Sequence, residues 1–168
     1  MRQLAGAMIL AVLLAACGQE KELSSLDPVN WEKRRITLSQ PDSLSHGSTY
    51  LSIYSEIYDR NVQITHPLTA TVSMRNKSST DSVYIHRADY YSTDGRLIRT
   101  YFDHPIFIRP LETIEIVIDQ SDKEGGTGAN FIFEWSAQKG ALEPFFEAVM
   151  ISTTGQQGIS FTTQGVKR

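Results

Sequence analysis

The sequence predicts an all-β protein, a single immunoglobulin-like β-sandwich of about seven to eight strands that follows a signal peptide and a polar tether. Three observations predict it. From Thr49 onward, apolar residues recur at every second position, as half-buried strands require. Clusters of turn-forming residues separate these segments. No segment has the apolar spacing of a long amphipathic helix.

The alternation is clearest where Phe131, Phe133 and Trp135 share one face of a predicted strand. The full set of strand candidates is 50–58, 68–74, 82–91, 96–102, 114–118, 131–135, 145–152 and 158–163. The turn signals lie at 76–79, 93–95, 109–112 and 154–158. The chain has one cysteine, so the prediction is a sandwich without the inter-sheet disulfide of antibody domains.

The N-terminus has the pattern of a lipoprotein signal peptide. Arg2 is followed by a run without charge from Leu4 to Ala16, which is shorter than the roughly 20 residues that span a bilayer. The run ends in "LAAC", which resembles the lipobox of bacterial lipoproteins. That resemblance implies lipid attachment to the Cys17 thiol and cleavage between Ala16 and Cys17. The alternative is an ordinary secretory signal that leaves a free thiol.

The composition divides the chain into three parts. Residues 1–16 are the predicted signal peptide, and 17–47 form a lipidated N-terminus and flexible linker rich in Ser, Pro and charged residues. Trp31 offers an apolar side chain with which this linker could dock on the domain. Residues 48–168 form the predicted β-sandwich.

The charge balance argues against a nucleic-acid partner. The formal net charge is −3 and the longest basic run is Lys33 to Arg35. A nucleic-acid site needs a basic face that neutralises phosphates, and nothing in the sequence supplies one.

The sequence predicts neither a metal site, nor a cofactor, nor catalytic residues. His46, His66, His86 and His104 are scattered and lack the spacing of zinc motifs. His86 and Asp89 lie three residues apart on a predicted strand, so we expect their side chains to point to opposite faces. The alternative is an envelope hydrolase or metal-dependent enzyme whose site is assembled from dispersed histidines and carboxylates. This alternative expects at least two of His66, His86 and His104 to converge with a carboxylate.

The run "DKEGGTGANF", residues 122–131, is the most motif-like stretch. A phosphate-binding loop would need a following helix, but Phe131 begins a strand pattern. The run also lacks the Lys-Ser/Thr end of a P-loop and the third glycine of a dinucleotide fingerprint. We therefore expect a turn between strands whose glycines adopt positive φ.

Three tyrosines are candidates for an interaction surface. Tyr50, Tyr54 and Tyr58 fall on one predicted strand face, opposite Leu51 and Ile53. Tyrosine has an apolar ring and a polar tip, which suits interfaces. The partner would be an envelope protein or a glycan. The alternative is a structural role, in which the rings cap the sandwich edge or pack under the tether. A further alternative is a subunit of a larger envelope complex that pairs through an edge strand.

The runs "TYLSIYSEIY", "RPLETIEIVI" and "GGTGANFIFEW" resemble bacterial lipoproteins that carry the domain-of-unknown-function family 3124. The resemblance covers about residues 47–161. It implies a small, secreted or lipid-anchored, mainly β domain and no catalytic residues.

These observations together predict a bacterial envelope lipoprotein that is anchored through Cys17 and displays a non-catalytic binding or structural domain. Gly18, in place of an aspartate, favours the outer membrane, facing the periplasm, if the host has two membranes.

Overall fold

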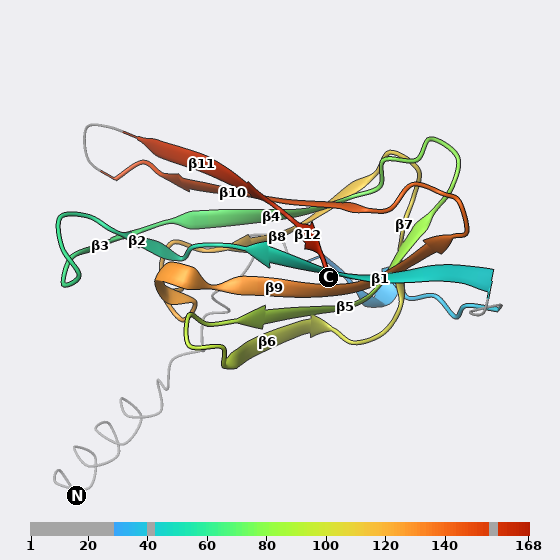
Figure 1. Cartoon of the computed structure of the whole chain (residues 1–168), viewed down its shortest axis with the longest axis horizontal. Coiled ribbons are helices and arrows are strands. Elements are labelled where there is room, and N and C mark those ends of the chain that lie inside the picture. Colours follow the sequence, from blue (N-terminus) through green and yellow to red (C-terminus); the bar gives the residue numbers. More distant parts are fainter. Residues whose placement is uncertain (1–28, 40–42, 155–157) are drawn as a thin grey trace, which may run out of the picture.

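The protein is a sandwich of two antiparallel β-sheets (Figure 1). The computed structural model describes residues 29–39, 43–154 and 158–168. One sheet has four strands in the order β11 (Ile159–Gln164), β10 (Phe145–Ser152), β4 (Thr69–Arg75) and β8 (Thr113–Ile118). Among the described residues, none forms a helix with the length and apolar character of a membrane span.

The second sheet has six strands. Its order is β12 (Val166–Lys167), β1 (Leu44–Ser52), β9 (Asn130–Gln138), β5 (Val83–Tyr91) and β6 (Leu97–Phe102), and β7 (Ile106–Ile108) also pairs with β5. A separate hairpin of β2 (Glu56–Tyr58) and β3 (Thr65–Pro67) projects from one end of the sandwich (Figure 1). The all-β sandwich prediction is confirmed.

Aromatic rings from both sheets form the centre of the core. Phe133 of β9 stacks on Phe146 of β10 with ring centroids 4.4 Å apart, and Phe131 stacks on Phe133 at 5.3 Å. These rings are at most 2% exposed, so each contributes about 2–3 kcal/mol by leaving water. The alternation of apolar residues along β9 therefore faces the other sheet, as the sequence predicts.

The strand β1 begins at Leu44, before the domain start expected at residue 48. The reason lies at Gly47, which pairs with Trp135 of β9. A Cβ at position 47 would overlap the Trp135 indole, so this inward position must be glycine. The first half of β1 thus lacks the apolar alternation by which strands are recognised in a sequence.

Part of the expected linker packs on the domain. The ring of Trp31 lies 4.8 Å from that of Phe102, and Arg34 forms an ion pair of 2.8 Å with Glu112. Arg35 forms an isolated antiparallel bridge with Ile106. The docking expected for Trp31 is confirmed, and residues 31–36 cover the side of the sandwich at β7.

A bulge changes which residues of β5 face outward. The register with β9 shifts between Ile85 and Arg87, so Ile85 and Ala88 both point into the core. Because His86 bonds the outward-facing Ser136, and Asp89 lies between the buried Ala88 and Tyr90, both side chains lie on the outer face. The expectation that His86 and Asp89 point to opposite faces is therefore wrong, since it assumed a regular strand.

Candidate functional site

The predicted lipid attachment site, Cys17, and the cleavage-site residue Ala16 lie outside the described residues. The tyrosines of the predicted interaction surface are described, and they differ in exposure. Tyr50 and Tyr58 are 37% and 56% exposed, whereas Tyr54 is half-buried and packs edge-to-face on Phe161 with centroids 5.7 Å apart. Tyr54 therefore has a packing role, as the structural alternative expects, and Tyr50 and Tyr58 keep exposed rings.

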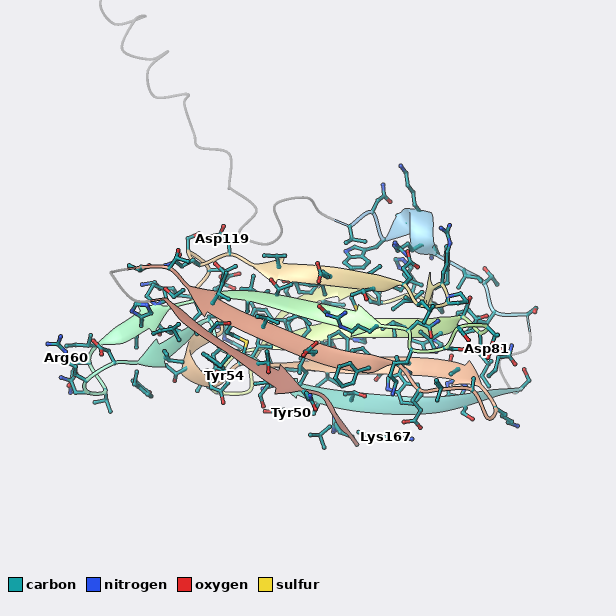
Figure 2. All side chains as sticks on the ribbon, turned by 90° about the horizontal axis from the view of Figure 1, so that it is seen from above. Tyr50, Tyr54, Arg60, Asp81, Asp119 and Lys167 are labelled. Carbon is teal, nitrogen blue, oxygen red and sulfur yellow. The ribbon has the colours of Figure 1, made fainter. Side chains whose placement is uncertain are left out.

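These residues lie along one long side of the sandwich, the side on which β11 also runs. Figure 2 shows Tyr54 and Tyr50 along this side, together with Lys167, with Arg60 at the tip of the projecting hairpin. Tyr50 pairs with the exposed Val166 of β12, and Tyr58 lies on β2. The exposed tyrosines thus lie on the same side of the sandwich as the strand β11.

We call the side of β11 that faces away from β10 the β11 edge. In the described parts of the chain no strand pairs with it. The Gly165 amide donates to the Phe146 carbonyl at 2.9 Å, so these two residues are a hydrogen-bonded pair in the register of β11 with β10. In an antiparallel ladder, bonded and non-bonded positions alternate. Phe161 and Thr163 therefore bond to β10, and the backbone groups of Ser160, Thr162 and Gln164 point to the β11 edge.

The side chains of the same strand also divide into two sets. Phe161 and Thr163 point inward, and the Thr163 hydroxyl donates to the Ser52 carbonyl at 2.6 Å. Ser160, Thr162 and Gln164 are exposed on the outer face of the four-stranded sheet. No residue of β11 is charged or a proline.

An uncharged surface continues from β11 across the four-stranded sheet. The strand register places Thr162, Val149, Thr71 and Val117 in one row, and Ser160, Ile151 and Thr69 in the next. We call these seven residues the neutral patch. The charged residues of this outer face lie in the neighbouring rows, where Arg75 is 3.5 Å from Glu147 and Ser73 donates to Glu115.

Three other described edge strands carry devices by which proteins discourage edge pairing. In the four-stranded sheet, the opposite edge strand β8 contains Glu115. In the six-stranded sheet, β12 contains Lys167, and β6 contains Arg99 and pairs with β5 through shifted registers. β11 has six residues and none of these devices.

The structure brings His46 and His86 together, a pair that the sequence did not indicate. Their ring centroids are 5.7 Å apart beside a shallow hollow that Ser48, Glu134 and the backbone at Gly47 also line. His86 Nε2 lies 2.8 Å from the Ser136 hydroxyl. Burial, and secondly the electrostatic influence of His46, lower the pKa of His86, while the Glu134 carboxylate acts against them.

The three histidines on which the enzyme alternative depends do not meet. His86 bonds Ser136, while His66 on β3 bonds the Ser152 hydroxyl at 2.9 Å. His104, in the loop before β7, lies 3.8 Å from Glu32. Within the described ranges, no three histidines, cysteines or carboxylates are grouped as metal ligands would be.

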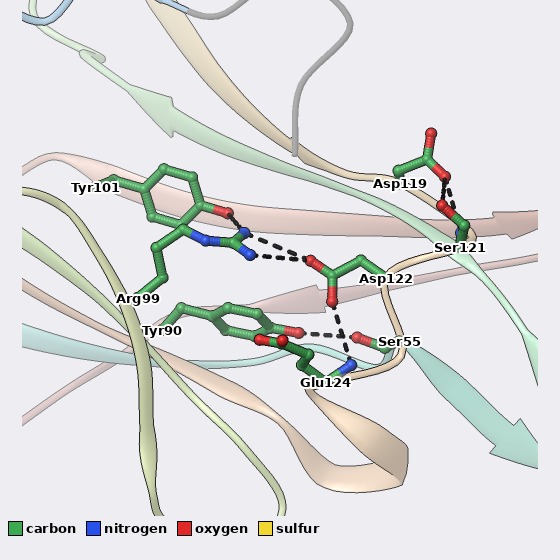
Figure 3. Close-up of polar contacts among 8 residues, drawn as sticks. All are labelled: Ser55, Tyr90, Arg99, Tyr101, Asp119, Ser121, Asp122 and Glu124. Carbon is green, nitrogen blue, oxygen red and sulfur yellow. Dashed lines mark hydrogen bonds and ion pairs between the residues drawn. The ribbon is translucent and has the colours of Figure 1, made fainter. Parts of the chain in front are cut away.

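The glycine-rich run contains a buried polar network rather than an open anion site (Figure 3). Asp122 is fully buried and accepts hydrogen bonds from both terminal nitrogens of Arg99 at 3.4 Å. Its other oxygen accepts the Glu124 amide at 3.2 Å. The Gly126 and Gly128 amides donate to the Lys123 carbonyl and the Thr93 hydroxyl. The amides that a phosphate would need are thus bonded within the protein.

The same turn packs against Tyr90. The Tyr90 and Ser55 hydroxyls are 2.8 Å apart, and burial raises the pKa of Tyr90 to about 12 in spite of this bond. A Cβ at Gly125 would lie 2.6 Å from the Ser55 hydroxyl and closer still to that of Tyr90. In this run only Gly126 has a positive φ, of 72°. The turn is confirmed, but Gly125 is required by close packing and not by its φ.

Comparison with family models gives one match over most of the chain. Residues 46–167 match the model described as "Protein of unknown function (DUF3124)". The chain belongs to this family. The match runs from the third residue of β1 to the end of β12 and includes the β11 edge and the glycine-rich turn, so these features lie inside the family domain.

The other comparisons add no functional assignment. No curated protein matches the sequence. Among solved structures, the chain is similar to one titled "Crystal Structure of Thermotoga maritima 1070", with 10% identity over 71% of this chain and 92% of the other, and a TM-score of 0.45.

Proposed function

We propose that the protein is a bacterial envelope lipoprotein, anchored through Cys17, whose β-sandwich has a non-catalytic binding or structural role. The observation that carries this proposal is the "LAAC" motif at the end of an apolar run that follows Arg2. Cleavage before Cys17 would leave a lipidated N-terminus, and residues 18–28 would then link the membrane to the segment that packs on the sandwich at Trp31.

The physical requirement for such an anchor is more than one acyl chain. A single chain binds a bilayer only marginally, and each buried methylene adds about 0.8 kcal/mol, so two or three chains hold the protein durably. Gly18 after the modified cysteine favours the outer membrane, facing the periplasm, in a host with two membranes.

The binding role is supported by the side of the molecule that carries the β11 edge. Exposed backbone groups at Ser160, Thr162 and Gln164 lie beside the neutral patch, and Tyr50 and Tyr58 expose apolar rings on the same side. The polar groups of the glycine-rich turn, by contrast, are buried and bonded to one another. The surface therefore offers pairing and apolar contact, which suit an envelope protein as partner.

Metabolic labelling with a palmitate analogue tests the anchor. The wild-type chain should incorporate the label and fractionate with membranes, and Cys17→Ala should lose both properties. Ser24→Ala, in the same polar segment, is the matched control and should keep them. Label retained in Cys17→Ala would contradict the proposal. Gly18→Asp tests the location, since it should move the protein to the inner membrane of a host with two membranes.

The enzyme alternative has one specific observation in its favour, the 2.8 Å contact between His86 Nε2 and the Ser136 hydroxyl. A serine nucleophile next to a histidine base is the arrangement of many hydrolases. Ser136 is fully buried, however, so a substrate cannot reach its hydroxyl in this conformation. A fluorophosphonate probe, which labels serine nucleophiles, distinguishes a hydrolase from a non-catalytic domain. Labelling that Ser136→Ala abolishes would establish the hydrolase, and the non-catalytic proposal expects no labelling.

A further inference from the structure

The β11 edge has backbone amides and carbonyls that no described strand pairs with. A strand edge with open backbone groups and no charge, proline or bulge is a template for a further strand. β11 has six residues, and its three outward-directed positions alternate regularly as Ser160, Thr162 and Gln164. An extended segment with uncharged side chains opposite these positions would fit this edge.

We propose that the occupant is the β11 edge of a second copy of the chain, paired antiparallel about a two-fold axis at Thr162. The proposal deepens the binding role proposed above by naming the partner. In this register the Thr162 amide and carbonyl bond those of Thr162 of the second copy. Ser160 faces Gln164 of the second copy, and the reverse pair is generated by the symmetry. Every open backbone group of the strand then has a partner.

The side chains are complementary in the same register. Threonine opposite threonine is a favourable cross-strand pair, and serine opposite glutamine adds a neutral polar pair. The row that contains Val117, Thr71, Val149 and Thr162 would continue through the axis into the same row of the second copy. The Thr162 row of the neutral patch thus runs across a continuous eight-stranded sheet, since the four-stranded sheet of each copy contributes its four strands.

The charges of the molecule favour this edge over the others for self-association. Two copies carry the same net charge of −3 and repel each other, so a contact through an uncharged surface adds the least repulsion at close range. Pairing through β8 would bring Glu115 close to the interface, and pairing through β12 would bring Lys167. Among the β8, β12 and β11 edges, only pairing through the β11 edge leaves the centre of the interface without charge. This neutrality and the two-fold fit of the register identify a second copy as the occupant.

The interface is small, so pairing in dilute solution should be weak. Anchoring would raise the local concentration of the copies on a membrane and favour the same contact. The anchor is thus a condition for strong pairing but not for the contact itself. The palmitate label reports the anchor separately, so failure of one proposal can be distinguished from failure of the other.

Charge complementation at the axis is the first test, with the lipidated full-length protein in mild detergent at several concentrations. The wild type should show a monomer–dimer equilibrium by analytical ultracentrifugation. Thr162→Lys or Thr162→Glu alone should raise the dimer Kd about fivefold to tenfold, because like charges meet at the axis. An equimolar mixture of the two variants should dimerise again. Thr113→Lys, exposed on the opposite edge strand, is the matched control and should leave the Kd unchanged.

Disulfide trapping is the second test. Residues opposite each other in a bonded antiparallel pair have Cα atoms about 5.5 Å apart, which a disulfide can bridge. Thr162→Cys should give a covalent dimer on oxidation of membranes, whereas Thr113→Cys should not. The parent chain is the control for Cys17, its one cysteine.

Three outcomes overturn the proposal. The first is a strictly monomeric wild type whose Thr162→Cys variant does not cross-link on membranes. The second is a dimer that persists unchanged in both charged variants. The third is recovery of β11 in a cross-link to a different protein, which would replace the second copy as its occupant.

Discussion

The glycine-rich turn and the β11 edge differ in how their backbone polar groups are satisfied. In the turn at 122–128, the amides of Glu124, Gly126 and Gly128 are bonded within the protein, and Asp122 is fully buried. At the β11 edge, backbone groups remain open and the side chains beside them are exposed. The comparison teaches that substitutions in the turn should change stability, while substitutions on the edge should change association.

The largest loss of stability is expected for Gly125→Val. Its Cβ would overlap the Tyr90 hydroxyl, lie 2.6 Å from the Ser55 hydroxyl and lie 2.8 Å from the Ala129 Cβ. Overpacking together with a broken buried hydrogen bond should cost about 3 kcal/mol or more. Thermal unfolding followed by circular dichroism measures it.

Gly128→Val is the matched control, because its Cβ would make ordinary contact at 3.4 Å with the Thr93 methyl group and its φ is not positive. The loss of stability in Gly126→Val should lie between those of Gly125→Val and Gly128→Val. Gly126 has a φ of 72°, and its Cβ would lie 2.7 Å from the Thr93 hydroxyl. Equal melting temperatures for the Gly125→Val variant and the wild type would contradict the close packing of this turn.

Asp122→Ala should give the next largest loss of stability. It removes the partner of Arg99 and the acceptor of the Glu124 amide, which leaves polar groups unsatisfied at a buried site. Arg99 keeps 29% of its side chain exposed, so we expect about 2–3 kcal/mol, which is less than for a fully buried pair. Urea denaturation measures the loss. Asp103→Ala, whose side chain is 76% exposed, should leave the midpoint unchanged, and equal midpoints for both variants would refute the role of Asp122.

A smaller effect is expected from the titration of His86. Its pKa in the folded protein is lowered, chiefly by burial, below the ordinary histidine value of 6.5. The unfolded chain therefore binds more protons between the two pKa values, and stability is full above pH 6.5 and falls as the pH drops below it. The free energy of unfolding, measured from pH 8 to pH 5, should show this decline. His86→Gln should reduce the slope of this free energy against pH. An identical slope in the wild type and the variant would contradict the contribution of His86.

The sequence predicts the parts of this molecule that depend on local pattern. The β9 face of Phe131, Phe133 and Trp135 is predicted because both the alternation and its buried partner sheet are regular. The turn at 122–128 is predicted because a strand follows the glycines. The docking of Trp31 is also predicted, since an indole in a polar segment gains free energy by leaving water.

The features that escape prediction depend on residues far away in the sequence. The bulge at His86 is visible only in the pairing of β5 with β9, and it brings His86 to the outer face beside His46. The burial of Asp122 depends on Arg99, which lies on another strand. The open edge of β11 is a property of strand order, which the alternation of apolar residues does not contain.

The smallest effect on stability is expected at the β11 edge itself, and it tests the comparison most directly. We propose to measure melting temperature and dimerisation for Thr162→Pro and Thr163→Pro. The Thr162 amide points to the open edge, so its loss should change the melting temperature little and abolish the dimer. The Thr163 amide bonds β10, and its side chain bonds Ser52, so Thr163→Pro should be strongly destabilising. Equal loss of stability in both variants, or a dimer that survives Thr162→Pro, would contradict the account.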